Sequence, residues 1–336
     1  MKFSIIGGGS WATALAKMLT DNGLHIGWWL RNQSVIDQIK KRRHNPHYLS
    51  SVLFNTAQLR MSTSVEEVVA DADVVLVCVP SAYLLPTLEN LSSNLFEGKM
   101  ILSAIKGILP NSDHQLLNEY LNNRFGVDIS SYFTVMGPCH AEEVANEKLS
   151  YLTFSGEDTE MAENIASHFR TDYLNTVVNH DVWGTQYAAV LKNIYAVGSG
   201  IAHGLEYGDN FQSVYISNAA DEMVGFLRKV MEYKKAPDTG KIQYSASVYL
   251  GDLLVTCYSL YSRNRTFGNM IGKGYSVKVA QLEMNMVAEG YPASRGLFEI
   301  NQVIGAQMPI STTVYNILWG EMPAKEGFKG IEKYLK

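Results

Sequence analysis

The stretch KFSIIGGGSWATALAKML, residues 2–19, passes from a short apolar run through three glycines into a helical pattern. The first part predicts a strand and the last part a helix. Between them lies the spacing G-x-G-x-x-A. In it Gly7 permits the tight turn, Gly9 lets a pyrophosphate approach the backbone and the small Ala12 lets the helix pack on the strand. The helix would then begin at the phosphates, so the stretch predicts a Rossmann-type dinucleotide-binding unit rather than a plain strand-to-helix turn.

Further apolar runs follow at the spacing of an α/β domain with a mostly parallel sheet. They predict a helix over residues 159–169 and strands over residues 25–30, 73–80, 99–104, 132–136, 150–154 and 174–178. Ligands bind at the carboxyl ends of parallel strands. The segments 105–107 and 137–143 come directly after two of these strands, and we therefore expect both at the ligand edge.

After about His180 the strand pattern stops and two long helical patterns appear, over residues 182–204 and 210–233. The chain therefore divides into a Rossmann-type NAD(P)-binding domain, residues 1–179, and an all-helical domain, residues 180–336.

Composition excludes several classes of protein. The chain has 336 residues, 46% of them hydrophobic, and a formal net charge of −5. This charge argues against a nucleic-acid surface, although a local basic pocket could still hold a small anion. Three scattered cysteines indicate a reducing compartment and no metal site, and we expect the cytoplasm. No signal peptide or 18-residue apolar stretch appears, so we expect no membrane span.

Lys192 is the candidate with the most chemistry. At helical spacing its neighbours are Ala188, Ala189, Tyr195 and Ala196, so its ammonium emerges from an apolar face. Desolvation lowers the pKa of a lysine toward neutrality, where it can exchange protons. The alternative is a lysine that lays its stem along the core and keeps its head in water.

A second cluster lies in the helical half. Asp252 and Thr256 share a helix face, because they stand four residues apart. The run Ser262-Arg263-Asn264 offers donors suited to a phosphate. Separately, Arg31 follows the strand 25–30, where an acid would favour NAD and an arginine suits a 2′-phosphate. Taken singly, Asp252 is better explained as a helix cap and the arginines of 262–265 as solvated loop residues, but the set together favours a site. For Arg31 a solvated loop residue is an equal alternative.

In order along the chain, the motifs GGGSWATALA, SAIKGI, GPCHAEEV, VLKNIYAVGSGIAHGL, GDLLVTCYSLYSRNRTFG and VAEG closely resemble the NAD(P)-dependent glycerol-3-phosphate dehydrogenases. The resemblance covers essentially the whole chain. It implies reversible hydride transfer between NAD(P)H and dihydroxyacetone phosphate, which gives sn-glycerol 3-phosphate for phospholipid synthesis. NADP and NAD are the implied cofactors. The oligomeric state is left open, and a homodimer is one candidate.

The resemblance also implies that the second domain binds the substrate and carries catalysis, and it implies roles for individual residues. Lys192 is similar to the family's proton-exchanging lysine, supported by Lys106, Asn193, Asp252 and Thr256. Substrate contacts are implied at Lys106, Gly137, Cys139, Lys192, Asp252, Ser262, Arg263 and Asn264. Cofactor contacts are implied at Gly7, Gly9, Ser10, Trp11, Arg31, Lys106, Ala141, Arg263, Val287 and Glu289.

The chain departs from the family at two places. Ser217-Asn218-Ala219 stands where the family usually has Thr-Arg-Gly, and the usual Leu-Pro is lost in the segment 50–54. One alternative function is a 2-hydroxyacid or ketopantoate-type reductase, which should not need the run 262–264. Another is a catalytically inactive dinucleotide-binding sensor, against which the intact Lys192 and Asp252 argue.

Overall fold

The computed structural model describes residues 1–110, 114–234, 242–284 and 286–336. These residues form two compact units. The first consists of Met1–Ile105 with Leu116–Val182, and the second of Lys106–Gln115 with Trp183–Lys336. The short segment Lys106–Gln115 thus follows a strand of the first unit but belongs, by its contacts, to the second.

The first unit is built on one eight-stranded sheet in the order β3-β2-β1-β4-β5-β6-β7-β8. All neighbouring strands are parallel except β6 and β7, which are antiparallel. The strands are β1 (Phe3–Ile6), β2 (Ile26–Trp29), β3 (Leu59–Ser62), β4 (Val74–Val77), β5 (Met100–Ser103), β6 (Tyr132–Met136), β7 (Ser150–Ser155) and β8 (Leu174–Asn179). Every predicted strand is confirmed, and of the strands in the described residues only the edge strand β3 was not predicted.

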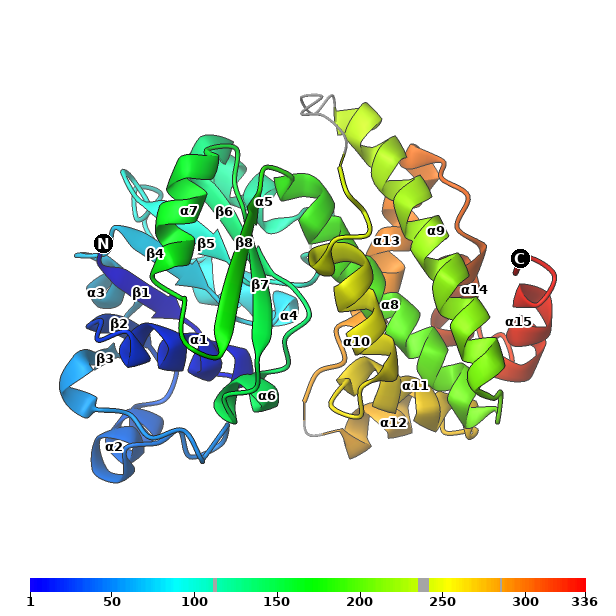
Figure 1. Cartoon of the computed structure of the whole chain (residues 1–336), viewed down its shortest axis with the longest axis horizontal. Coiled ribbons are helices and arrows are strands. Elements are labelled where there is room, and N and C mark those ends of the chain that lie inside the picture. The colour runs from blue at the N-terminus through cyan, green and yellow to red at the C-terminus, as the bar shows by residue number, and fades with distance from the viewer. Residues whose placement is uncertain (111–113, 235–241, 285) are drawn as a thin grey trace. The chain divides into compact units, whose positions relative to one another are not determined.

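Helices follow the strands as they do in doubly wound folds (Figure 1). They are α1 (Ser10–Asp21), α2 (Gln33–Arg42), α3 (Val65–Val69), α4 (Ser81–Leu88), α5 (Leu117–Phe125), α6 (Ala141–Ala145) and α7 (Thr159–Ser167). The central strands β1 and β4 are buried along their whole length, which explains the continuous apolar sequence of β4 and, apart from Ser4, that of β1.

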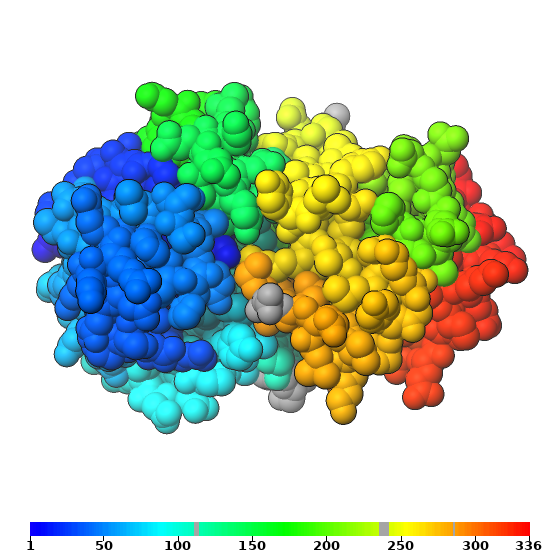
Figure 2. Space-filling model, turned by 90° about the horizontal axis from the view of Figure 1, so that it is seen from below, coloured from blue at the N-terminus to red at the C-terminus, as the bar shows by residue number. Residues whose placement is uncertain are grey.

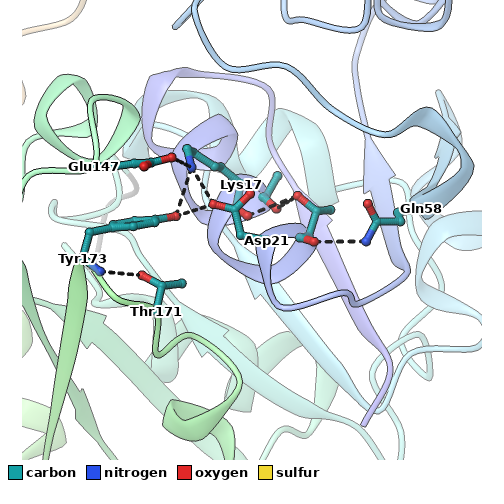
Figure 3. A network of polar contacts seen from close by, with 8 residues as sticks. Lys17, Asp21, Gln58, Glu147, Thr171 and Tyr173 are labelled. Atoms are coloured by element: carbon teal, nitrogen blue, oxygen red, sulfur yellow. Dashed lines mark hydrogen bonds and ion pairs between the residues drawn. The ribbon is translucent and has the colours of Figure 1, made fainter.

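A buried lysine fastens the far end of α1 (Figure 3). The Lys17 ammonium donates to Asp21 (2.5 Å), to Glu147 after α6 (2.9 Å) and to the Tyr173 hydroxyl before β8 (3.2 Å). Burial alone would lower the pKa of Lys17, but these three bonds raise it above its ordinary value. The charge is thus retained and ties α1 to two other segments of the unit.

All the regular secondary structure that the described residues of the second unit form is helical, as predicted. Its helices are α8 (Val182–Gly204, whose first residue falls in the first unit), α9 (Asp209–Lys234), η3 (Ser247–Gly251, a π-helical turn), α10 (Asp252–Tyr258), α11 (Arg263–Gly272), α12 (Val277–Glu283), α13 (Gly290–Ile304), α14 (Pro309–Trp319) and α15 (Ala324–Ile331). Helix α8 is buried along almost all of its length, as expected of a helix that is apolar on every face. The segment α10–α12, yellow to orange in Figure 2, lies at the surface. No described helix is long and apolar enough to cross a membrane.

Glycines bring α11 against α8. A Cβ at Gly200 would lie 2.1 Å from the Arg265 carbonyl, and one at Gly268 would lie 1.9 Å from the Val197 carbonyl. Because no side chain fits between them, the two backbones approach very closely. These contacts lie along residues 197–204 of α8, and the first turn of α11 reaches Asn193, next to Lys192, through the Asn264 amide (2.9 Å).

Candidate active site

Lys192 lies in the buried middle of α8, and only 5% of its surface is exposed. Its ammonium donates to Asp252 Oδ1 in a buried ion pair. Burial lowers the pKa of Lys192 to about 8, with Asp252 opposing the decrease and the Lys106 ammonium adding to it. The expectation of an apolar setting is confirmed, and a lysine with this pKa can both give and take a proton near neutral pH.

Asp252, the first residue of α10, supplies the counter-charge and one more acceptor. The Thr256 hydroxyl donates to the Asp252 carbonyl (2.5 Å) and lies 3.4 Å from Oδ1 of the same residue. The other carboxylate oxygen, Oδ2, is buried and has no hydrogen-bond partner among the described residues. A buried carboxylate oxygen without a donor is costly, so this atom is a natural acceptor for a bound hydroxyl.

Asn193 and Asn264 together join four segments of the second unit. Its Nδ2 donates to the Lys106 carbonyl (3.0 Å), and its Oδ1 accepts from Asn264 Nδ2 (2.9 Å). Asn264 Oδ1 in turn accepts the backbone N–H of Gly290 (2.9 Å). Asn193 was predicted to support Lys192 and Asn264 to contact the substrate, but nothing in the sequence indicated that their amides bind each other. Gly290 ends the quoted motif VAEG, but no role was predicted for it.

Arg263 begins α11, directly after the helix cap Ser262. The Ser262 hydroxyl accepts the N–H of Arg265 (3.3 Å), so this side chain is already used in capping. Arg263 is half-buried and forms no ion pair with a carboxylate in the described parts of the chain. An unpaired guanidinium at a helix N-terminus favours an anion, and a phosphate fits its geometry.

Val287 and Glu289 lie in the link between α12 and α13, both half-buried. Glu289 directly precedes Gly290, whose N–H holds Asn264. The resemblance assigns both residues to the cofactor. Both belong to the same unit as Lys192.

The glycine turn in the first unit has the shape that a pyrophosphate requires. Gly7 has φ +139°, and a Cβ there would lie 2.1 Å from the Cys78 carbonyl. Around Gly9, by contrast, a Cβ would meet nothing within 4 Å, so the space before α1 is open. The buried Asn45 side chain braces the turn by donating to the Gly8 carbonyl (3.1 Å) and to Thr13 Oγ1 (2.9 Å). These residues fit a dinucleotide whose phosphates meet the start of α1.

The remaining predicted cofactor and substrate residues of this unit lie at helix starts and strand ends. Ser10 and Trp11 open α1, and Ala141 opens α6. Gly137 follows β6 with φ +136°, and the buried Cys139 donates its thiol to the Tyr151 carbonyl (3.1 Å).

Arg31 stands exposed just after β2. The nearest acid, Asp37, lies inside α2 and accepts from Gln33 (2.9 Å). Residues 30–36, which follow β2 in the sequence, contain no carboxylate.

The residues at the two departures from the family bond to residues other than Lys192. Asn218 in α9 holds the main chain of Lys336, donating to its carbonyl (3.2 Å) and accepting its N–H (3.1 Å). In the segment 50–54 the buried Phe54 is fixed by backbone bonding to Arg43 (2.7 Å). Both positions thus have structural partners of their own.

Comparison with known proteins shows the family to which the chain belongs. The family described as NAD-dependent glycerol-3-phosphate dehydrogenase N-terminus matches residues 2–162, and its C-terminal counterpart matches residues 181–329. The chain is 34% identical to glycerol-3-phosphate dehydrogenase [NAD(P)+] of Chlorobium limicola over 97% of its own length and 96% of that protein. It is 30% identical to the enzyme of the same name from Enterococcus faecalis, over 98% and 95%.

Solved structures agree on the fold. Glycerol-3-phosphate dehydrogenase from Coxiella burnetii superposes with a TM-score of 0.88 at 24% identity, covering 99% of this chain and 98% of that one. A 2-dehydropantoate 2-reductase from Geobacter metallireducens gives a TM-score of 0.57 at 16% identity, over 96% of this chain and 100% of that one. Both comparisons bear on architecture alone, and the first is the closer match of the two.

Proposed function

Because the chain belongs to the NAD-dependent glycerol-3-phosphate dehydrogenase family, we propose that it interconverts dihydroxyacetone phosphate and sn-glycerol 3-phosphate with NAD(P)H or NAD(P)+. The observation that carries the proposal is the buried pair of Lys192 and Asp252, in which a lysine with a pKa of about 8 lies beside an unpartnered carboxylate oxygen. A carbonyl reduction needs a proton donor of this kind and a place for a neighbouring hydroxyl.

A nicotinamide dinucleotide, held by the glycine turn at Gly7 and Gly9, would supply the hydride that reduction at C2 of the substrate needs. The Lys192 ammonium gives its proton to the oxygen that becomes the C2 hydroxyl. Asp252 stabilises the ammonium through Oδ1 and accepts a substrate hydroxyl at Oδ2. In oxidation Lys192 acts as the free amine and takes the same proton back, so atoms and charge balance in both directions.

Arg263 holds the substrate phosphate in this proposal, at the start of α11. We expect Arg263→Ala to lower kcat/KM for dihydroxyacetone phosphate by about 10- to 100-fold, mainly through KM, since one charge-assisted contact is lost. Unphosphorylated dihydroxyacetone is the internal control, because the variant should use it as poorly as the parent does. An equal loss with both substrates would show that Arg263 does not contact the phosphate.

Arg31 sets the cofactor preference in this proposal. An arginine can pair with a 2′-phosphate and still tolerate a plain ribose, so we expect the parent to use NADPH at least as well as NADH, with a preference of about tenfold or less. The measurement is kcat/KM for both nucleotides in the parent and in Arg31→Ala at fixed ionic strength. A tenfold preference of the parent for NADH, or an unchanged NADPH preference in the variant, would make Arg31 a solvated loop residue.

The activity itself is tested with a substrate panel. The purified chain is incubated with NADPH or NADH and either dihydroxyacetone phosphate, dihydroxyacetone or ketopantoate, and nicotinamide absorbance is followed. Oxidation that depends on dihydroxyacetone phosphate supports the proposal. Turnover of ketopantoate in its place would favour the reductase alternative, and binding of NADPH without any turnover would favour the sensor.

Three further expectations go with this function. We keep residues 1–179 and 180–336 as the functional division into cofactor and substrate domains. The free cysteines suit a cytoplasmic enzyme that makes glycerol phosphate for lipids. The homodimer stays a prediction, which sedimentation of the purified chain can decide.

A further inference from the structure

Three hydrogen bonds in the second unit form an unbroken relay between two backbone groups. It starts at the N–H of Gly290, passes through the side-chain amides of Asn264 and Asn193, and ends at the carbonyl of Lys106. The bonds measure 2.9, 2.9 and 3.0 Å, and they connect residues 26, 71 and 87 positions apart in the sequence. The relay therefore links α13, α11, α8 and the segment Lys106–Gln115.

The two ends fix the direction of the relay. A backbone N–H can only donate and a backbone carbonyl can only accept, so both amides between them must point the same way. Turning either amide over would set oxygen against oxygen or N–H against N–H. Asn264 and Asn193 are both buried, and a mismatch there would leave polar groups unpaired away from water.

Gly290 is the residue that allows the relay to begin where it does. A Cβ at this position would lie 2.4 Å from the Asn193 carbonyl oxygen and 2.8 Å from Val197 Cγ2. Any side chain would therefore push the start of α13 away from α8. Only glycine lets the Gly290 N–H reach the Asn264 amide at this distance.

The far end of the relay bears on the proton donor. The Lys106 carbonyl accepts a hydrogen bond from Asn193 Nδ2. The Lys106 ammonium lies near enough to the Lys192 ammonium to repel it. Within the described parts of the chain, the other titratable groups that act on Lys192 are Asp252 and the Cys257 thiol, both from α10. Burial raises the pKa of Cys257 to about 12, so this thiol stays neutral. The charges that tune Lys192 are thus Asp252 and Lys106.

We propose that Gly290 is a positioning residue for the reaction, an inference that rests on the proposed function. Acting through Asn264 and Asn193, its N–H holds the main chain of Lys106. The Lys106 ammonium therefore stays beside the general acid Lys192. Asn264 serves this relay with its oxygen and with one of its two amide hydrogens.

The test is the pH dependence of kcat/KM for dihydroxyacetone phosphate reduction, because this ratio breaks at the pKa of Lys192. Lys106→Met removes the repelling charge, keeps the carbonyl, and should move the break upward. Gly290→Ala and Asn264→Leu should move it in the same direction by about 0.5–1 pH unit, and lower the plateau by about tenfold, because the ammonium is no longer held in place. Neither variant adds or removes a charge.

Gly225→Ala is the matched control, since Gly225 is an exposed helical glycine whose Cβ would meet nothing within 4 Å. It should leave the break and the plateau unchanged. If Gly290→Ala does not fold, Asn264→Leu decides alone. A break that stays in place in the folded relay variants, or in Lys106→Met, overturns the inference. A parent that does not reduce dihydroxyacetone phosphate at all overturns the proposed function instead, which separates the two failures.

Discussion

Replacing Lys192 by alanine is expected to lower kcat for dihydroxyacetone phosphate reduction by about 10²- to 10⁴-fold, the usual contribution of a positioned general acid. The lysine is buried in the second unit and is bonded to Asp252, whereas the glycine turn that fits the pyrophosphate lies in the first unit. The dissociation constant for NADPH should therefore change little. The measurements are kcat under saturation and NADPH affinity by fluorescence titration.

Two results would contradict the role of Lys192 as the proton donor. One is a variant whose kcat stays within a few-fold of the parent. The other is a variant that has lost NADPH binding together with activity, since the defect would then be one of folding or cofactor binding. A thermal melt of the variant, compared with that of the parent, separates these two causes.

Replacing Asp252 by asparagine is expected to have the second largest effect, a decrease of about 100-fold in kcat/KM for reduction at pH 7.5, mostly because a buried ammonium is left without its counter-charge. Asp252 raises the pKa of Lys192 against burial, so its loss should lower this pKa below about 8. Since reduction needs the ammonium, the rate should begin to fall at a lower pH than in the parent.

The sign of this shift is the strongest check. Asp252→Asn should move the break in kcat/KM downward, whereas Lys106→Met should move it upward, because the two residues act on Lys192 with opposite charge. Both substitutions nearly preserve side-chain size, so packing changes little. Breaks that move in the same direction, or a break that does not move in Asp252→Asn, would show that Asp252 does not set the charge of Lys192.

Local sequence patterns were sufficient for most of the fold. The central strands are continuous apolar runs because both of their faces are buried, and α8 could be read to its exact ends, Val182–Gly204. The strand β3 was not predicted because only one residue of its sequence, Leu-Arg-Met-Ser, is buried at the edge of the sheet. An edge strand of four residues has too little apolar pattern to be recognised.

In the candidate site too, features that depend on neighbouring residues were predicted, and features that depend on distant residues were not. The apolar surroundings of Lys192 follow from residues one turn away along its own helix, and so the sequence predicted them. The bonds of Asn193 to Lys106 and to Asn264 join residues 87 and 71 positions apart, and no local pattern encodes such a pairing. Gly290 was missed for a related reason, because its importance depends on how closely α13 approaches α8.

The central claim is that one group, Lys192, gives the proton in reduction and takes it in oxidation. Its most direct test is kcat/KM measured from pH 6 to 10 in both directions, a range of about two units on either side of the expected pKa. We predict that the rate of reduction falls and the rate of oxidation stops rising at the same pH, close to the pKa of about 8 expected for Lys192. In Lys192→Ala this common break should vanish from the residual rate. Breaks at different pH values in the two directions, or a break near pH 8 that persists in Lys192→Ala, would contradict the account.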